Sequence, residues 1–179
     1  MVNGLRKKYA LEMMWKGENM KYDKVVVGGT FDHLHDGHKS LLSKAFEMGD
    51  RVLIGIVSGP LELKKDAAGI RPLSERMSDL ESYLRTKGWT ARAEIVTISD
   101  PIGPAADDED LEAIVVTEET RSRAEKINDL RVENGLNELD IMEVPLIPAD
   151  DGRPISSIRI RYGEIDEHGD VIRDEKNST

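Results

Sequence analysis

The amino-acid sequence predicts an α/β fold, an open parallel five-stranded sheet with helices on both faces. Three observations lead to this prediction. Short apolar runs rich in valine and isoleucine alternate with segments of helical periodicity. Several of these runs are hydrophobic on both faces, which is typical of parallel strands covered by helices. The chain has 179 residues, a length that suits one domain with its own hydrophobic core.

The first strand is predicted from "KVVVGG" (residues 24–29), and the first helix from "DGHKSLLSKAFEMG" (residues 36–49). The spacing of the helical segment places its apolar side chains on one side. These side chains are Leu41, Leu42, Ala45 and Phe46.

The second strand is predicted from "RVLIGIVS" (residues 51–58), which is apolar on both faces. The second helix, residues 72–88, has proline near its start and Gly88 past its end. "AEIVTI" (residues 93–98) predicts the third strand, and the prolines, glycine and acids of residues 99–110 predict a loop.

"EAIVVT" (residues 112–117) predicts the fourth strand. Thr117 is placed to cap a helix over residues 118–135, which Gly135 would end. A fifth strand is predicted over residues 139–147.

A turn, "PADDGRP" (residues 148–154), should place a short final helix, "ISSIRIRYG" (residues 155–163). The alternation of strands and helices implies right-handed crossovers and a Rossmann-like sheet. Ligands of such sheets bind beyond the carboxyl ends of the strands.

The composition restricts the classes of protein. The chain has no cysteine, which excludes disulfides and thiolate catalysis. Its net charge of −10 argues against a nucleic-acid partner, although a few cations in one cleft can still hold a small anion. No apolar stretch has membrane-spanning length, so we expect no membrane partner and a cytoplasmic protein.

The segment "GGTFDHLHDGH" (residues 28–38) has the features of a phosphate-binding site. Gly28 and Gly29 end the first strand and allow a ligand to approach the backbone, and Thr30 adds a hydroxyl. His35 and His38 stand three residues apart near the start of the next helix, where backbone N–H groups already favour an anion.

Two other interpretations of this segment are a polar surface loop and a metal site. A two-histidine metal site would need a third ligand, for which His33, Asp32 and Asp36 are the nearby candidates. The acidic run at residues 106–110 lacks the spacing of a calcium loop and is better interpreted as a solvated loop.

The sequence resembles the HIGH-motif nucleotidyltransferases. "GGTFDHLHDGH" is similar to their first motif, and "ISSIRIR" (residues 155–161) is similar to their second, Ile-Ser-Ser-Thr-x-Ile-Arg. The segments "DPIGP", "VVTEET" and "RYGEID" resemble the archaeal phosphopantetheine adenylyltransferases in particular. These enzymes transfer AMP from ATP to 4′-phosphopantetheine, giving dephospho-coenzyme A and pyrophosphate.

The resemblance implies roles for individual residues. His35, His38, Thr30 and Lys64 would be the catalytic residues, and Thr30, Lys64 and Lys65 would bind the acceptor. The ATP-binding residues would be Gly28, Gly29, Thr30, Phe31, His35, His38, Glu118, Arg121, Ser156, Ser157 and Arg161. Mg²⁺ would arrive with ATP, held mostly by phosphates and water, with no dedicated metal site in the protein.

One position departs from the family pattern. Ile158 stands where the family usually has threonine, so one hydroxyl toward the triphosphate is missing. The predicted organisation is a mobile N-terminal extension over residues 1–20, a nucleotidyltransferase domain over residues 21–172 and a C-terminal tail over residues 173–179.

The two motifs indicate where a triphosphate binds. They do not identify the acceptor molecule or the base of the nucleotide equally well. Another adenylyl- or cytidylyltransferase, acting on FMN, nicotinamide mononucleotide or glycerol phosphate, is therefore a second interpretation. A nucleotide-binding regulator without catalysis is a third. The sequence does not indicate the oligomeric state.

Overall fold

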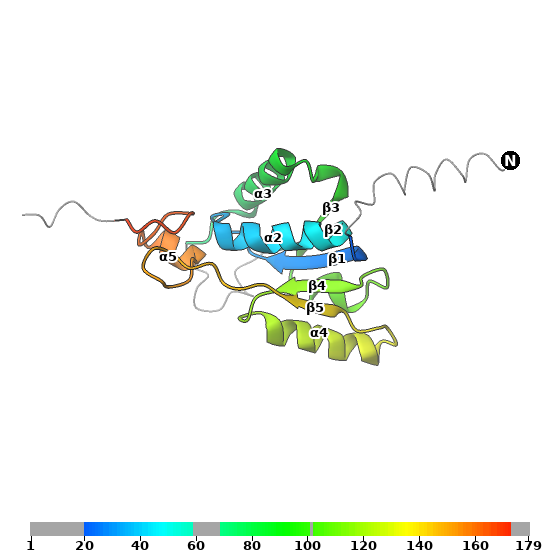
Figure 1. The fold of residues 1–179 in the computed structure, drawn as a ribbon. Coiled ribbons are helices and arrows are strands. Elements are labelled where there is room, and N and C mark those ends of the chain that lie inside the picture. The colour runs from blue at the N-terminus through cyan, green and yellow to red at the C-terminus, as the bar shows by residue number, and fades with distance from the viewer. Residues whose placement is uncertain (1–19, 59–68, 101, 173–179) are drawn as a thin grey trace, which may run out of the picture.

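Five parallel strands form one open sheet in the order β3-β2-β1-β4-β5 (Figure 1). The structure is a computed structural model that describes residues 20–58, 69–100 and 102–172. The strands are β1 (Tyr22–Gly29), β2 (Gly49–Val57), β3 (Ala93–Ile98), β4 (Ala113–Val116) and β5 (Asp140–Glu143). The predicted Rossmann-like α/β fold is confirmed.

Four α-helices accompany the sheet in the described part of the chain: α2 (Asp36–Met48), α3 (Leu73–Lys87), α4 (Arg121–Glu133) and α5 (Ser157–Arg161). Two 3₁₀ turns, η3 (Thr90–Arg92) and η4 (Gly103–Ala106), lie before and after β3. No helix in these described segments is both long enough and apolar enough to cross a membrane.

The alternation of side chains along β1 creates a core on each face of the sheet. Val25 and Val27 pack with residues of α2 and α3 on one face. Val26 points to the other face, where it packs with residues of α4. Figure 1 shows α2 and α3 on one side of the sheet and α4 on the other. This placement brings the start of α2 and the start of α4 to opposite sides of the carboxyl end of β1.

The short helix α5 lies beyond the carboxyl ends of the strands (Figure 1). The turn before it has Gly152 at a φ of 78°, in the left-handed region that favours glycine. Asp151 in this turn accepts a hydrogen bond from Arg159 of α5 at 2.6 Å. The turn therefore positions the final helix, as predicted.

The start of α4 corrects a prediction. Thr117 does not cap this helix, because residues 118–120 form a turn and the N-cap is Thr120. The Thr120 hydroxyl accepts a hydrogen bond from the Thr117 N–H at 3.1 Å, which stabilises that turn. The helix thus begins three residues later than predicted.

β5 and the final helix are the elements that fall furthest short of their predicted lengths. The β5 ladder ends at Glu143 rather than at residue 147, and Pro145, which lacks an N–H, cannot continue it. The final helix is confined to Ser157–Arg161. The predicted helix ends at Gly88 and Gly135 are confirmed, because each glycine follows its helix with a positive φ.

Several predictions lie outside the described residues. They are the proposed N-terminal extension up to residue 19, the tail over residues 173–179, and the acceptor residues Lys64 and Lys65. The division of the chain into these three parts stays a prediction.

Candidate active site

A cleft of about 350 Å³ opens at the carboxyl ends of β1 and β4, between the starts of α2, α4 and α5. It brings together residues of the two motifs that are more than 100 positions apart in the chain. The predicted site residues that line it are Gly28, Gly29, Thr30, His35, His38, Ser156, Ser157 and Arg161.

The His35 imidazole caps the helix that carries His38. His35 is the N-cap of α2, and its Nδ1 accepts a hydrogen bond from the Gly37 N–H at 3.1 Å. Since Nδ1 acts as an acceptor, the proton of the neutral ring lies on Nε2. A Cβ at Gly37 would come within 2.9 Å of the His35 ring, so this spacing requires glycine between the two histidines.

The two imidazoles stack with ring centroids 3.8 Å apart. Burial lowers the pKa of His35 to about 4, and burial together with the neighbouring His35 lowers the pKa of His38 well below its ordinary value. Both rings are therefore neutral near pH 7 and can stabilise an anion as hydrogen-bond donors rather than as cations.

Phe31 does not line the cleft, but it packs against His38, which does. It is fully buried with a positive φ of 50°, and its ring centroid lies 5.3 Å from that of His38. A Cβ at Gly29 would contact the Phe31 ring at 3.5 Å. Phe31 thus contacts the glycine turn and packs against the His38 ring.

Asp32 joins the first motif to the second. Its fully buried carboxylate accepts hydrogen bonds from Arg161 Nη1 at 2.8 Å and from Arg71 Nε at 3.2 Å. Its carbonyl oxygen accepts a hydrogen bond from the Ser157 hydroxyl at 2.7 Å. Burial by itself would raise the pKa of Asp32, but the hydrogen bonds from the two arginines outweigh it and the net shift is downward.

Arg76 of α3 holds the ends of two strands. Its Nη1 donates to the carbonyl oxygens of Thr30 at 2.7 Å and of Val57 at 2.9 Å, and its Nε donates to Arg71 O at 2.9 Å. Arg76 is only 3% exposed. The position of the Thr30 backbone therefore depends on this buried guanidinium.

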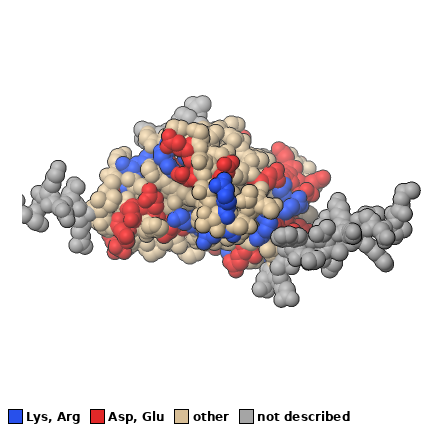
Figure 2. Space-filling view, turned by 90° about the horizontal axis from the view of Figure 1, so that it is seen from above, with Lys and Arg blue, Asp and Glu red and all other residues tan. Residues whose placement is uncertain are grey.

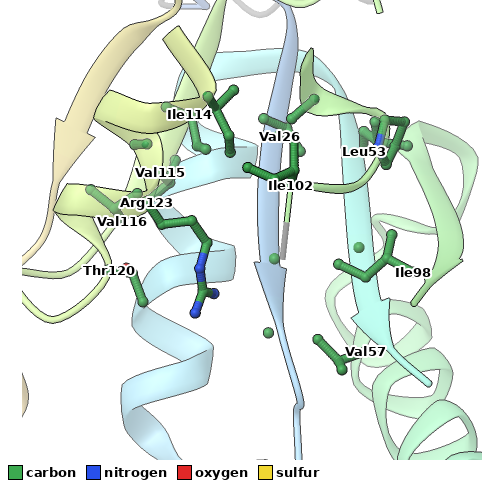
Figure 3. Close-up of a pocket in the computed structure, with 17 residues that line it drawn as sticks. Val26, Leu53, Val57, Ile98, Ile102, Ile114, Val115, Val116, Thr120 and Arg123 are labelled. Carbon is green, nitrogen blue, oxygen red and sulfur yellow. The ribbon is translucent and has the colours of Figure 1, made fainter. Parts of the chain in front are cut away.

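A second, apolar compartment of about 50 Å³ adjoins the cleft on the α4 face of the sheet (Figure 3). Its floor is formed by strand residues such as Val26, Leu53 and Gly55, and η4 and α4 provide its walls. The two cavities share Gly28, Gly29, Val57, Val115, Thr120 and Arg123.

The described residues offer no cluster of three or more His, Cys, Asp and Glu side chains suited to hold a metal ion. The cleft is lined mainly by imidazoles, hydroxyls, arginines and apolar groups, with the Glu119 carboxylate among them. This donor set fits a Mg²⁺ held by nucleotide phosphates and water better than a protein-built metal cage.

A sequence profile of the cytidylyltransferase-like family matches residues 26–163. The chain belongs to this family. It is also 48% identical over 153 residues to a phosphopantetheine adenylyltransferase of Methanothermobacter thermautotrophicus, covering 86% of this chain and 92% of that protein. A phosphopantetheine adenylyltransferase of Thermococcus kodakarensis is 46% identical over 159 residues, covering 88% of this chain and 96% of the relative. The resemblance predicted from the two motifs is confirmed.

Solved structures agree with the fold of this cytidylyltransferase-like protein. A protein of unknown function from Archaeoglobus fulgidus superposes with a TM-score of 0.61 at 36% identity, covering 68% of this chain and 88% of that one. A tyrosyl-tRNA synthetase from the same organism gives a TM-score of 0.59 at 12% identity, covering 84% of this chain and 62% of that one, which shows the fold alone.

Besides Phe31, the structure places two other predicted ATP-binding residues, Glu118 and Arg121, outside the cleft. Glu118 is exposed and does not line it. Arg121 is also outside, because its guanidinium pairs with Glu125 and Glu143, each at 3.1 Å. The neighbouring Glu119 and Arg123 line the cleft instead.

The spacing of the side chains around α4 explains why only one of the two arginines lines the cleft. Thr120 and Arg123 are three residues apart, so they lie on the same side of the first turn of α4. Arg121 and Arg123 are two positions apart, which is about 200° around the helix axis, so the two side chains cannot both face the cleft. The sequence contains two threonines, Thr117 and Thr120, that satisfy the preference for an N-cap. This second possible cap was the only local indication that the helix could begin later than predicted.

Proposed function

We propose that this protein is a phosphopantetheine adenylyltransferase, which transfers AMP from ATP to 4′-phosphopantetheine and forms dephospho-coenzyme A and pyrophosphate. The observation that carries the proposal is the stacked, neutral pair His35 and His38 in the cleft of a chain that is 48% identical to a protein of that name. The cleft has room for a nucleotide, and its polar groups come from both motifs.

The reaction forms one P–O bond and breaks another. An oxygen of the acceptor phosphate attacks the α-phosphorus of ATP, and the bond between that phosphorus and the bridging oxygen to the β-phosphate breaks. The electron pair leaves with pyrophosphate. The acceptor phosphate is already anionic near pH 7, so the reaction needs positioning and charge stabilisation more than a strong base.

The two histidines supply donors where negative charge develops. His35 Nε2–H and the His38 ring would donate to oxygens of the α-phosphate and the leaving group. Because their pKa values are lowered, they need no proton uptake at neutral pH to act in this way. The His35–Gly37 hydrogen bond fixes the ring orientation before substrate arrives.

Ser156, Ser157 and Arg161 would hold the β- and γ-phosphates from the other side of the cleft. Ser157 Oγ already donates to Asp32 O, so it must exchange that partner in order to donate to a phosphate. Mg²⁺ bound to the nucleotide would neutralise charge on the same phosphates.

Thr30 would orient the acceptor phosphate beside the glycine turn, together with Lys64 or Lys65, which lie outside the described residues. Glu119 lines the cleft where Glu118 does not, and its carboxylate would accept hydrogen bonds from nucleotide hydroxyl or amino groups.

Pyrophosphate release in the presence of ATP and Mg²⁺ tests the proposal. The acceptors are 4′-phosphopantetheine, FMN, nicotinamide mononucleotide and glycerol 3-phosphate, each also tested with CTP. We expect turnover with ATP and 4′-phosphopantetheine only. Turnover with another acceptor or with CTP alone would identify a different nucleotidyltransferase, and binding of ATP without any turnover would identify a regulator.

A further inference from the structure

Arg76 is a buried arginine that binds the backbone of three separate segments. On the face of the molecule shown in Figure 2, basic side chains lie at the surface among acidic ones. Arg76, in the first turn of α3, is instead only 3% exposed, and it donates to the carbonyl oxygens of Thr30, Val57 and Arg71. The planar guanidinium therefore fixes these three segments relative to one another.

Two of the three segments form walls of the cleft. Thr30 and Val57 both line it, whereas Arg76 does not. The ladder between β1 and β2 ends at the pair Gly29 and Ile56, one residue before each of these carbonyls. Arg76 Nη1 donates to both carbonyls, at 2.7 and 2.9 Å, and so joins the two chains just beyond the point where the sheet stops joining them.

The loop that follows Thr30 needs such an anchor. Phe31 has a φ of 50°, and a bulky residue keeps this backbone conformation only where the surrounding contacts hold it. Arg76 holds Thr30 directly. It also holds the carbonyl of Arg71, whose Nε donates to the Asp32 carboxylate at 3.2 Å. The residues on both sides of Phe31 are thus anchored, directly or through one intermediate, to the same guanidinium.

Arg92 makes the same kind of contacts at the opposite end of β2. Its Nε donates to Asp50 O at 2.9 Å, and its Nη2 donates to Phe46 O and Gly49 O, each at 2.6 Å. Neither Arg92 nor these partners line the cleft. Arg76 and Arg92 therefore have the same number of carbonyl partners, and only those of Arg76 include residues of the site.

We propose that Arg76 is a positioning residue of the transfer reaction. By holding the Thr30 carbonyl it keeps the Thr30 backbone, and with it the hydroxyl, aligned with the acceptor phosphate, without touching either substrate. This proposal rests on the proposed adenylyltransferase function, in which Thr30 orients that phosphate. Because a misplacement of about 1 Å can lower a rate about 10²-fold, loss of the Arg76 contacts should appear mainly in kcat.

Steady-state kinetics of Arg76→Lys and Arg92→Lys test the proposal. Lysine keeps the charge but loses the planar fork. We expect Arg76→Lys to lower kcat with 4′-phosphopantetheine by about 10- to 100-fold and to leave the KM for ATP within about 3-fold. Arg92→Lys is the matched control, which should lower the melting temperature by a similar amount and keep kcat within about 2-fold. An unchanged kcat in Arg76→Lys, or equal losses of kcat in the two variants, would overturn the proposal.

A double-mutant cycle tests whether Arg76 acts through Thr30. Once Thr30→Ala has removed the hydroxyl, its misplacement no longer matters, so the combined loss of kcat should be smaller than the product of the single losses. Losses that multiply would show that Arg76 does not act through Thr30 and would overturn the assignment. Arg76→Gln, which has two N–H donors and no charge, is a second variant for the same cycle and should give the same result.

The imidazole NMR signals of His38 report the position of the loop without any turnover. The Phe31 ring centroid lies 5.3 Å from that of His38, so a displaced loop changes the ring-current shift of these signals. We expect Arg76→Lys to move them and Arg92→Lys to leave them unchanged. Signals that move in neither variant would overturn the role of Arg76. Absence of turnover by the wild-type protein with 4′-phosphopantetheine would overturn the proposed function, while the NMR comparison would still decide whether Arg76 holds the loop.

Discussion

Arg161 Nη1 lies 2.8 Å from Asp32 Oδ2, so the end of the second motif is joined to the first by an ion pair whose carboxylate is fully buried. Ser157 adds a hydrogen bond to the carbonyl of the same aspartate. These contacts span about 125 positions of sequence. They hold α5 against the loop that carries the histidines, and so determine the width of the cleft between the two motifs.

Replacing Asp32 with asparagine should separate these segments. We expect Asp32→Asn to lower the free energy of unfolding by about 3 kcal/mol, because it removes the buried negative charge to which Arg161 and Arg71 both donate. It should also raise the KM for ATP. Denaturant unfolding and steady-state kinetics measure both effects. Asp36→Asn is the control, since the Asp36 carboxylate is much more accessible and its loss should cost under about 1 kcal/mol. Equal effects of the two variants would contradict the role of Asp32.

The observed capping role of His35 and its proposed role as a donor to phosphate can be separated by substitution. Asparagine is a good N-cap, so His35→Asn should keep the stability of α2, whereas His35→Ala should lose about 1 kcal/mol. Both variants lack the Nε2–H donor, and we expect both to lower kcat by about 10²-fold. Chemical denaturation and kcat for the pair give the comparison. A normal kcat in the asparagine variant would show that His35 serves only as a cap.

His38 should act mainly on the transition state. We expect His38→Ala to lower kcat by about 10²-fold or more, with a smaller change in ATP affinity, as for loss of a preorganised donor. Single-turnover rates and ATP titration by calorimetry separate the two quantities. Circular dichroism confirms that the variant is folded. A near-normal kcat in a folded variant would remove His38 from the mechanism.

The lowered histidine pKa values predict how stability changes with pH. Below about pH 6.5 the unfolded chain protonates these histidines, while folded His35 remains neutral down to a pKa of about 4. The unfolded state then binds more protons than the folded state, so the free energy of unfolding falls as the pH decreases from about 6.5 toward 4. Above about pH 6.5 the histidines make their full contribution to the free energy of unfolding.

Denaturant unfolding at a series of pH values tests this dependence. Replacing both histidines with asparagine should flatten the curve between about pH 6.5 and 4. The Asp32 carboxylate, whose pKa is lowered, contributes mainly below about pH 5, so it affects only the acid end of this window. The same slope in wild type and the double variant would show that other groups cause the acid sensitivity.

Ser157 and Ile158 test the contribution of the second motif. Both residues line the cleft. Ser157→Ala should raise the KM for ATP without unfolding the protein. Ile158→Thr should be tolerated and lower that KM, since one added hydrogen bond to a charged group contributes at most about 1.5–3 kcal/mol. Melting temperatures and KM values are measured for both. A lower melting temperature with no gain in affinity for Ile158→Thr would indicate a buried, unsatisfied hydroxyl.

Much of this protein follows from local sequence. The valine and isoleucine runs around Val25 and Ile54 identify the parallel strands, because a strand covered on both faces must be apolar throughout. Gly88 and Gly135 end their helices because glycine adopts a positive φ without strain. The His35 and His38 spacing predicts one shared side of a helical turn. These are properties of adjacent residues, so the sequence by itself determined them.

The tertiary structure decided what depends on distant residues. Both Thr117 and Thr120 satisfy the local preference for an N-cap, and the turn over residues 118–120 selects Thr120. The packing of α4 against the sheet places Arg123 at the cleft and leaves Arg121 paired outside it. The Asp32–Arg161 ion pair and the lowered histidine pKa values likewise arise from burial and long-range contacts, which no short segment contains.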